Sequence, residues 1–120
     1  VVDHVKKVID DDRIKIGQGA FNVDPSKVSD VNTSNFSGLH RTIAQAFPEA
    51  KVAPYLVVGA TDSRHFKGVS DQIFRFSPIR ISPANVKSFH GLNERIAVSD
   101  YHSSIQFYMQ LIRNTHRELN

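Results

Sequence analysis

The stretch Val52-Ala-Pro-Tyr-Leu-Val-Val58, followed by Gly59, is the most apolar part of this chain of 120 residues. A continuous apolar run of this length, bounded by proline and glycine, is typical of a strand buried inside a parallel or mixed sheet. The run Gln72-Ile-Phe-Arg-Phe76 predicts a second strand. The alternating Arg13-Ile-Lys-Ile16 predicts another strand, half-buried, nearer the start of the chain.

Helical patterns alternate with these strands. A first helix is expected to end near Asp10, because three carboxylates in a row oppose the dipole at a helix C-terminus. Ser34 offers an N-cap for a second helix, which Pro48 ends. Ser99 offers a cap for a long helix over about 100–116. The order helix, strand, linker, helix, strand, strand, helix predicts an α/β fold. The expected core is made of Phe36, Leu39, Ile43, Val57, Val58, Ile105 and Tyr108.

The composition excludes several classes of protein. Fifteen Lys and Arg face twelve Asp and Glu, and the basic residues are scattered singly, so no basic stripe for nucleic acid is present. No stretch approaches the roughly 20 apolar residues that span a bilayer. The chain has no cysteine, which excludes disulfides, thiolate metal sites and a cysteine nucleophile.

The first helix and strand are separated from the rest by residues 20–33, where turn-forming residues dominate. One strand cannot make a stable sheet by itself. The chain also begins at Val1 and not at methionine. We therefore expect a piece of a longer protein, in which the unpaired edge of Arg13–Ile16 could recruit a second copy of the chain.

The loop Gly59–His65 is the first candidate site. It follows the predicted buried strand, and ligands of open α/β sheets lie outside the carboxyl ends of strands. Gly59 would allow the backbone to approach a ligand, and Arg64 offers a planar fork for a carboxylate. The alternative is a structural turn in which Asp62 and Arg64 pair with neighbours.

His90 marks the second candidate loop. A lone histidine is more often held by a backbone carbonyl than by a metal ion. A catalytic zinc site needs about three protein ligands and a water. Asp62, His65 and Glu94 could supply further ligands, but no tight spacing connects them with His90.

Two motifs carry a resemblance to a known family. Val52-Ala-Pro-Tyr-Leu-Val-Val-Gly-Ala-Thr-Asp-Ser-Arg-His-Phe66 and Phe89-His-Gly-Leu-Asn-Glu-Arg-Ile96 resemble the C-terminal part of the zinc aminoacylase/carboxypeptidase metallopeptidases. Ile73-Phe-Arg-Phe-Ser-Pro78 lies between them, as in that family. The chain is most similar to the carboxypeptidase S / Gly-Xaa carboxypeptidase branch, over essentially its whole length.

The resemblance implies a domain layout and a site. Residues 1–20 would be the end of the lid, a dimerisation-type domain, and residues 21–120 the C-terminal part of the α/β catalytic domain. His90 would be a ligand of one of two zinc ions. Gly59, Thr61 and Arg64 would line the substrate pocket. The general base and the other metal ligands would lie upstream, so no catalytic residue is expected in this chain. With those ligands absent, His90 is expected to be at least partly exposed, on an open concave face near Thr61–Arg64.

The resemblance further implies hydrolysis of the amide bond next to a free C-terminal carboxylate, as in a carboxypeptidase acting on peptides. The alternatives are an aminoacylase-type hydrolase of N-acyl amino acids and a small α/β binding module without catalytic activity. In the first two cases the longer protein would be a zinc enzyme, and these 120 residues alone would be inactive.

Overall fold

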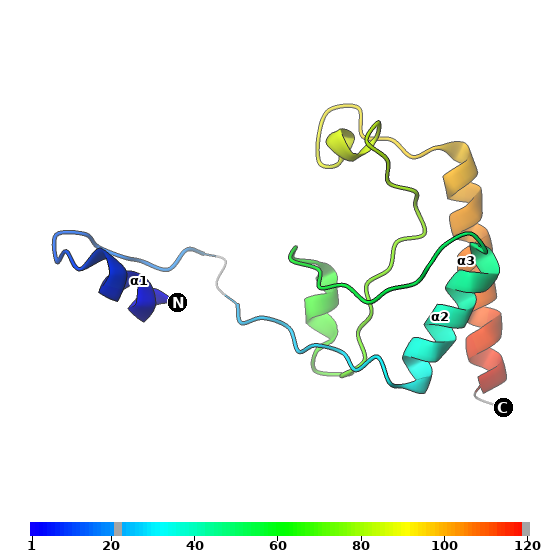
Figure 1. Cartoon of the computed structure of the whole chain (residues 1–120), viewed down its shortest axis with the longest axis horizontal. Helices are drawn as coiled ribbons and strands as arrows, with labels where there is room; N and C mark the ends of the chain where they lie inside the picture. The colour runs from blue at the N-terminus through cyan, green and yellow to red at the C-terminus, as the bar shows by residue number, and fades with distance from the viewer. Residues whose placement is uncertain (21–22, 119–120) are drawn as a thin grey trace.

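The computed structural model describes residues 1–20 and 23–118. Within them the chain forms three α-helices and two short 3-10 helices, joined by long irregular segments (Figure 1). In chain order these are α1 (Val2–Ile9), α2 (Ser34–Ala46), η1 (Asp62–Phe66), η2 (Val86–Ser88) and α3 (Val98–Glu118). None of them, among the described residues, is long and apolar enough to cross a membrane.

The predicted strands are not formed, and the α/β class is therefore not confirmed. Residues 13–16, 52–58 and 72–76 run as irregular chain, and no residue of 1–20 or 23–118 is assigned to a strand. A strand exists only with a neighbour that takes up its backbone hydrogen bonds. At Ile73 a side chain takes that place, because the Ser29 hydroxyl accepts from the Ile73 N–H and donates to the Ile73 carbonyl, both at 2.9 Å.

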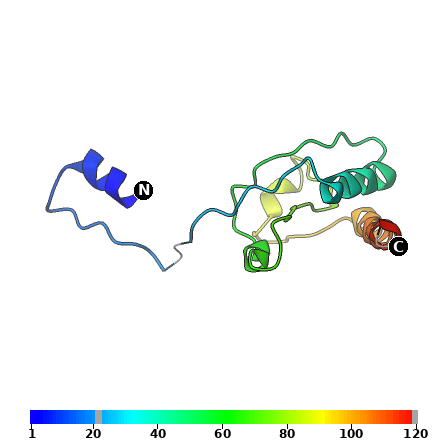
Figure 2. The same cartoon turned by 90° about the horizontal axis from the view of Figure 1, so that it is seen from below.

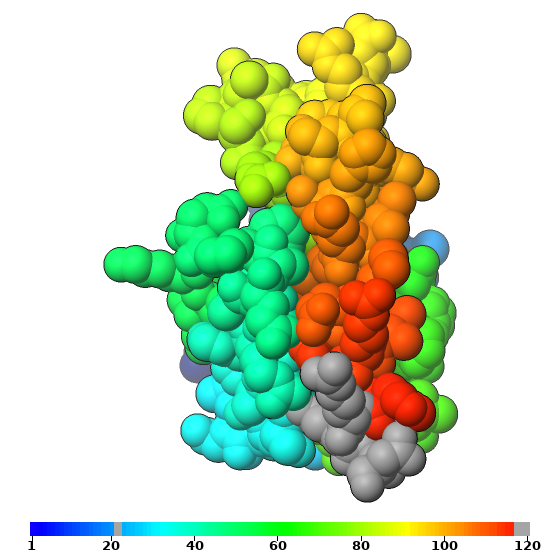
Figure 3. All heavy atoms as spheres, turned by 90° about the vertical axis from the view of Figure 1, so that its right-hand side faces the viewer, coloured from blue at the N-terminus to red at the C-terminus, as the bar shows by residue number. Residues whose placement is uncertain are grey.

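The core lies where α2 packs on α3. Figure 3 shows the two helices side by side along their length. Ile43 and Phe47 from the α2 side and Phe107 from α3 are buried there. Four half-buried residues, Leu39, Ala46, Val52 and Leu111, pack around them. A core of this size leaves most of the chain's apolar residues in contact with solvent.

The ends of α2 follow local rules. The Phe36 N–H donates to the Thr33 hydroxyl at 3.3 Å, so Thr33 caps the helix and Ser34 is its first residue. At the other end, the residue before Pro48 leaves the helical conformation, as predicted. The prediction for the last helix was wrong, because Ser99, predicted as its cap, lies inside α3, which begins at Val98.

A buried polar contact sets how α2 and α3 face each other. Asn114 donates from its amide to the Thr42 hydroxyl and to Gln45 Oε1, each at 2.8 Å. Thr42 is fully buried and donates in turn to the Gly38 carbonyl at 2.8 Å. Each buried polar atom is thus satisfied, which favours one register of the two helices.

The predicted core was only partly right. Ile43 is buried, and Phe36 and Leu39 are half-buried. Val57 and Val58 are exposed, because no sheet covers the segment that carries them. The prediction was also wrong for two residues of α3, since Ile105 and Tyr108 are exposed and the face with Phe107 meets α2. The outer face of α3 is therefore apolar and open to solvent.

The N-terminal segment lies apart from the rest of the molecule (Figures 1 and 2). α1 ends at Ile9, and Asp10 adopts a left-handed conformation with φ of 46°, so the predicted end of this helix is confirmed. Beyond it, Arg13 Nη2 lies 2.6 Å from Asp11 Oδ2. The predicted domain boundary falls at residue 21, outside the described residues, and the division into two domains stays a prediction.

Candidate functional site

The loop Gly59–His65 is organised by Thr61. Its hydroxyl accepts from the Ser63 N–H at 3.2 Å, and its carbonyl accepts from the Arg64 N–H at 3.2 Å, so Thr61 caps η1. The Thr61 and Ser63 hydroxyls also bond each other. Thr61 and Arg64 are half-buried. Gly59 is exposed, and a side chain there would meet nothing within 4 Å, so the fold itself does not require a glycine.

Arg75 is the residue of this site that the sequence did not reveal. Its Nε donates to the Ser63 hydroxyl at 2.7 Å and to the Thr61 hydroxyl at 3.3 Å. Its Nη2 donates to the Ser26 hydroxyl at 3.3 Å. Three segments distant in sequence meet at this one guanidinium. The one signal in the sequence is that Arg75 is a polar residue between two apolar residues of a predicted strand. That pattern does not indicate which partners its side chain contacts.

His90 lies in a turn that follows η2. Its φ of 56° is in the left-handed region, as is the φ of 61° at Asn93. The His90 backbone N–H donates to Glu94 Oε2 at 3.2 Å, so Glu94 holds the backbone and not the imidazole. The Gly91 N–H donates to the Ser88 carbonyl at 2.9 Å, which continues the turn from η2. His90 itself is exposed, as predicted.

The structure does not bring the two loops together. η1 and η2 lie at opposite ends of the irregular part of the molecule, in green and yellow-green in Figure 1. The expected proximity of His90 to Thr61–Arg64 is therefore not found in this chain. In the described part of the chain, no group of three or more His, Asp and Glu side chains could hold a metal ion. Asp62 and His65 thus do not complete a metal site with His90.

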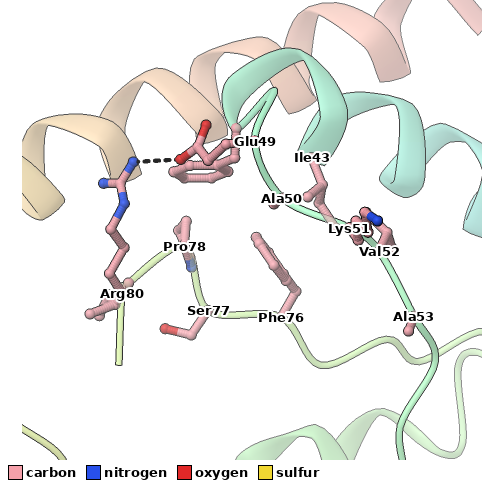
Figure 4. A pocket seen from close by; sticks show the side chains of 12 residues that line it. Ile43, Glu49, Ala50, Lys51, Val52, Ala53, Phe76, Ser77, Pro78 and Arg80 are labelled. Atoms are coloured by element: carbon pink, nitrogen blue, oxygen red, sulfur yellow. Dashed lines mark hydrogen bonds and ion pairs between the residues drawn. The ribbon is translucent and has the colours of Figure 1, made fainter. Parts of the chain in front are cut away.

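A largely apolar hollow lies elsewhere, at the end of α2 (Figure 4). Its volume is about 280 Å³, and its walls include Ile43, Phe47 and Phe76. Arg80 closes one side, with Nη2 at 2.9 Å from Glu49 Oε1 and Nη1 at 3.1 Å from Asp100 Oδ1.

Glu49 and Arg80, at the rim of this hollow, are paired with each other. A backbone hydrogen bond at Glu49 and the Arg80 guanidinium together hold the pKa of the Glu49 carboxyl below its usual value. The hydrogen bonds to Glu49 and Asp100 raise the pKa of Arg80. The Arg80 guanidinium also lies 5.5 Å from the centre of the Phe47 ring. This arrangement stabilises the end of α2 and leaves the Arg80 guanidinium engaged by two carboxylates.

Comparison with known proteins identifies relatives along nearly the whole chain. Probable carboxypeptidase S-like 2 of Dictyostelium discoideum is 37% identical over 119 residues, which are 99% of this chain and 23% of that protein. The N-fatty-acyl-amino acid synthase/hydrolase PM20D1 of Xenopus tropicalis is 40% identical over 116 residues, 96% of this chain and 22% of that protein. Human PM20D1 is 35% identical over 116 residues, with 95% and 23% covered.

No family model matches the chain, and no solved structure is significantly similar to it. The chain spans about a quarter of the length of the curated relatives it matches. These matches confirm the resemblance seen in the two motifs. The chain belongs to the family that contains the carboxypeptidase S-like proteins and the PM20D1 proteins.

Proposed function

We propose that this chain is part of a zinc-dependent hydrolase that cleaves the amide bond next to a free carboxylate, as a carboxypeptidase acting on peptides. The observation that supports it best is the similarity, over at least 95% of the chain, to relatives of both kinds. One kind is named for carboxypeptidase and the other for N-fatty-acyl amino acids. The C-terminal residue of a peptide and an N-acyl amino acid share one chemical unit, an amide nitrogen whose α-carbon carries a carboxylate.

The chain alone does not fit a zinc ion. Zinc requires three or four protein ligands, and the described residues bring no such group together. An exposed imidazole is available at His90, and we propose it as one ligand of a site that the rest of a longer protein completes. Bound zinc would act there as a Lewis acid on the scissile carbonyl. The general base would belong to that other part as well.

The loop after Gly59 is proposed to bind the substrate carboxylate. Arg64 carries a guanidinium, whose fork matches the two oxygens of a carboxylate. The Thr61 cap fixes the backbone from which Arg64 extends, through the 3.2 Å bond between the Arg64 N–H and the Thr61 carbonyl. Gly59, with open space around it, would let a ligand approach the backbone.

The exposed apolar segments support an α/β catalytic domain in the longer protein. Tyr55 and Val58 are 85% and 95% exposed, although the run that contains them is the most apolar of the chain. Such a run without hydrogen-bonded neighbours suits a buried strand whose partners lie in another part of the protein. On this proposal residues 1–20 end a lid domain, and residues 21–120 form the C-terminal part of the catalytic domain.

An aminoacylase-type activity is the second candidate. The 40% identity to a PM20D1 protein favours it, since that relative is named for N-fatty-acyl amino acids. By contrast, an independent small α/β binding module would need a sheet and a larger core. The described residues form no strand and bury only three hydrophobic side chains.

The test is to express the longer protein that contains this chain and to measure amino-acid release from peptides and from N-acyl amino acids. We expect zinc-dependent hydrolysis of at least one of the two substrate classes. His90→Ala should abolish this hydrolysis and should also lose the bound zinc. His102→Ala is the matched control, because His102 is an exposed histidine on α3 that we place outside the site. Full activity and full zinc content in His90→Ala would contradict the proposed role of His90. Absence of hydrolysis in the purified, zinc-loaded protein would contradict the function itself.

A further inference from the structure

Arg75 connects the proposed carboxylate-binding loop to the rest of the molecule. Its strongest contact is the 2.7 Å hydrogen bond from Nε to the Ser63 hydroxyl, inside η1. The same Nε reaches the Thr61 hydroxyl, which is the cap of η1. The two hydroxyls bond each other as well, so guanidinium, cap and first turn form one small network.

This network is needed because η1 has little stability by itself. A 3-10 helix of five residues has poor hydrogen-bond geometry and few turns over which to offset the cost of ordering. The orientation of Arg64 follows that of the Thr61 cap, since the Arg64 N–H is bonded to the Thr61 carbonyl. A donor that fixes the Thr61 and Ser63 hydroxyls therefore fixes the direction in which Arg64 leaves the backbone.

Arg75 is itself held from the other side. Its Nη2 donates to Ser26, and its neighbour Ile73 is bonded through both backbone groups to Ser29. The Thr33 hydroxyl, which caps α2, also donates to Gln72 Oε1 at 2.9 Å. The loop is thus connected through Arg75 to the segment that leads into α2.

Among the described residues, no ion pair neutralises the charge of Arg75. Within the described residues its hydrogen bonds go to three neutral hydroxyls, and no carboxylate lies within ion-pair distance of it. An unneutralised guanidinium beside the loop raises the local positive potential, which favours an anionic ligand.

We propose that Arg75 is a positioning residue for the substrate carboxylate: it holds the Thr61–Arg64 loop in the shape that binds this group. The proposal rests on the function proposed above and extends it to a residue that does not touch the substrate. It assigns Arg75 to recognition of the carboxylate and not to bond cleavage.

The test compares a substrate that has a free carboxylate with its C-terminal amide, in the longer protein. Arg75→Ala should raise KM for the acid by roughly tenfold, the scale of one lost hydrogen bond to a charged group, with kcat little changed. Binding of the amide, measured as competitive inhibition, should change far less. Arg75→Lys should recover only part of the preference for the acid, because the donors of an ammonium all leave one nitrogen, whereas the hydroxyls are bonded from Nε and Nη2 of the guanidinium.

Lys27→Ala is the control. Lys27 forms an exposed ion pair with Asp71 at 3.0 Å, between the same two segments, but does not contact the loop. This variant should retain the preference for the acid. If the role of Arg75 were merely structural, Arg75→Ala would weaken the binding of acid and amide alike. That result, or an unchanged preference for the acid over the amide, would overturn the proposal. If Arg75→Ala does not fold, the same comparison of acid and amide binding in Arg75→Lys tests the proposal. A wild-type protein without hydrolytic activity would instead contradict the proposed function, and this proposal with it.

Discussion

Phe107 is the residue on which the fold of this chain depends most. It is 2% exposed, and its ring centre lies 5.0 Å from that of Phe76 and 6.3 Å from that of Phe47. Replacing a buried phenylalanine by alanine costs about 3–5 kcal/mol. The open hollow beside Phe47 and Phe76 gives these rings room to relax, so the lower end, about 3 kcal/mol, is expected for Phe107→Ala. That is a large part of the about 5–15 kcal/mol that stabilises an ordinary domain.

The assay is urea unfolding of the 120-residue chain, followed by helical circular dichroism. Ile105→Ala is the matched control, since Ile105 lies two residues away on the same helix and is 44% exposed. It should lose less than about 1 kcal/mol. Equal losses in the two variants, or a loss below about 1 kcal/mol in Phe107→Ala, would show that α2 and α3 do not pack through this ring.

Two further results are expected from the same chain. The pKa of Glu49 is lowered by a backbone hydrogen bond and by Arg80, and that of Asp11 by its hydrogen bonds with Arg13, so both carboxyls bind protons more weakly in the folded state. Their contribution to stability is therefore complete above their ordinary pKa values of 4.5 and 3.8. It is lost as the pH falls through the lower pKa values of the folded state. Urea unfolding midpoints measured across that acidic range would show the loss. In calorimetric zinc titration we expect no micromolar 1:1 binding, because His90 has no partner ligands here; tight binding that His90→Ala abolishes would mean that the site is complete in this chain.

The sequence was sufficient where structure is decided locally. The end of α2 before Pro48 and the end of α1 before Asp10 follow from backbone and charge rules that act within one turn. The cap of α2 was misplaced by a single residue, because Thr33 and Ser34 offer the same hydroxyl. Periodicity along one chain gave the helices reliably but not their partners.

The face of a helix that becomes buried depends on what packs against it. α3 carries apolar residues on two sides. From the sequence alone, the stripe through Ile105 and Tyr108 is as suitable for burial as the side with Phe107. The hydrogen bond between Asn114 and Thr42, which are 72 residues apart in the sequence, favours the side of α3 that faces α2. Strands have the same dependence on partners, which is why the most apolar run produced no strand.

The candidate site shows the same division. The exposed position of His90 could be predicted, because its partner ligands were expected in another part of a longer protein. The role of Arg75 could not, because its contacts reach 14 residues back to Thr61 and 49 residues back to Ser26. Hydrogen bonds between distant segments leave no trace in local composition.

The backbone of His90 has a consequence for the balance between stability and activity. Its φ of 56° is a conformation in which a residue with a β-carbon is strained by about 1 kcal/mol or more, while glycine is not. A glycine at this position would therefore relax the turn and remove the imidazole in the same step. A sequence optimised for stability alone would not keep histidine here, so a screen for thermostable variants would tend to select against the very side chain that the proposed activity requires.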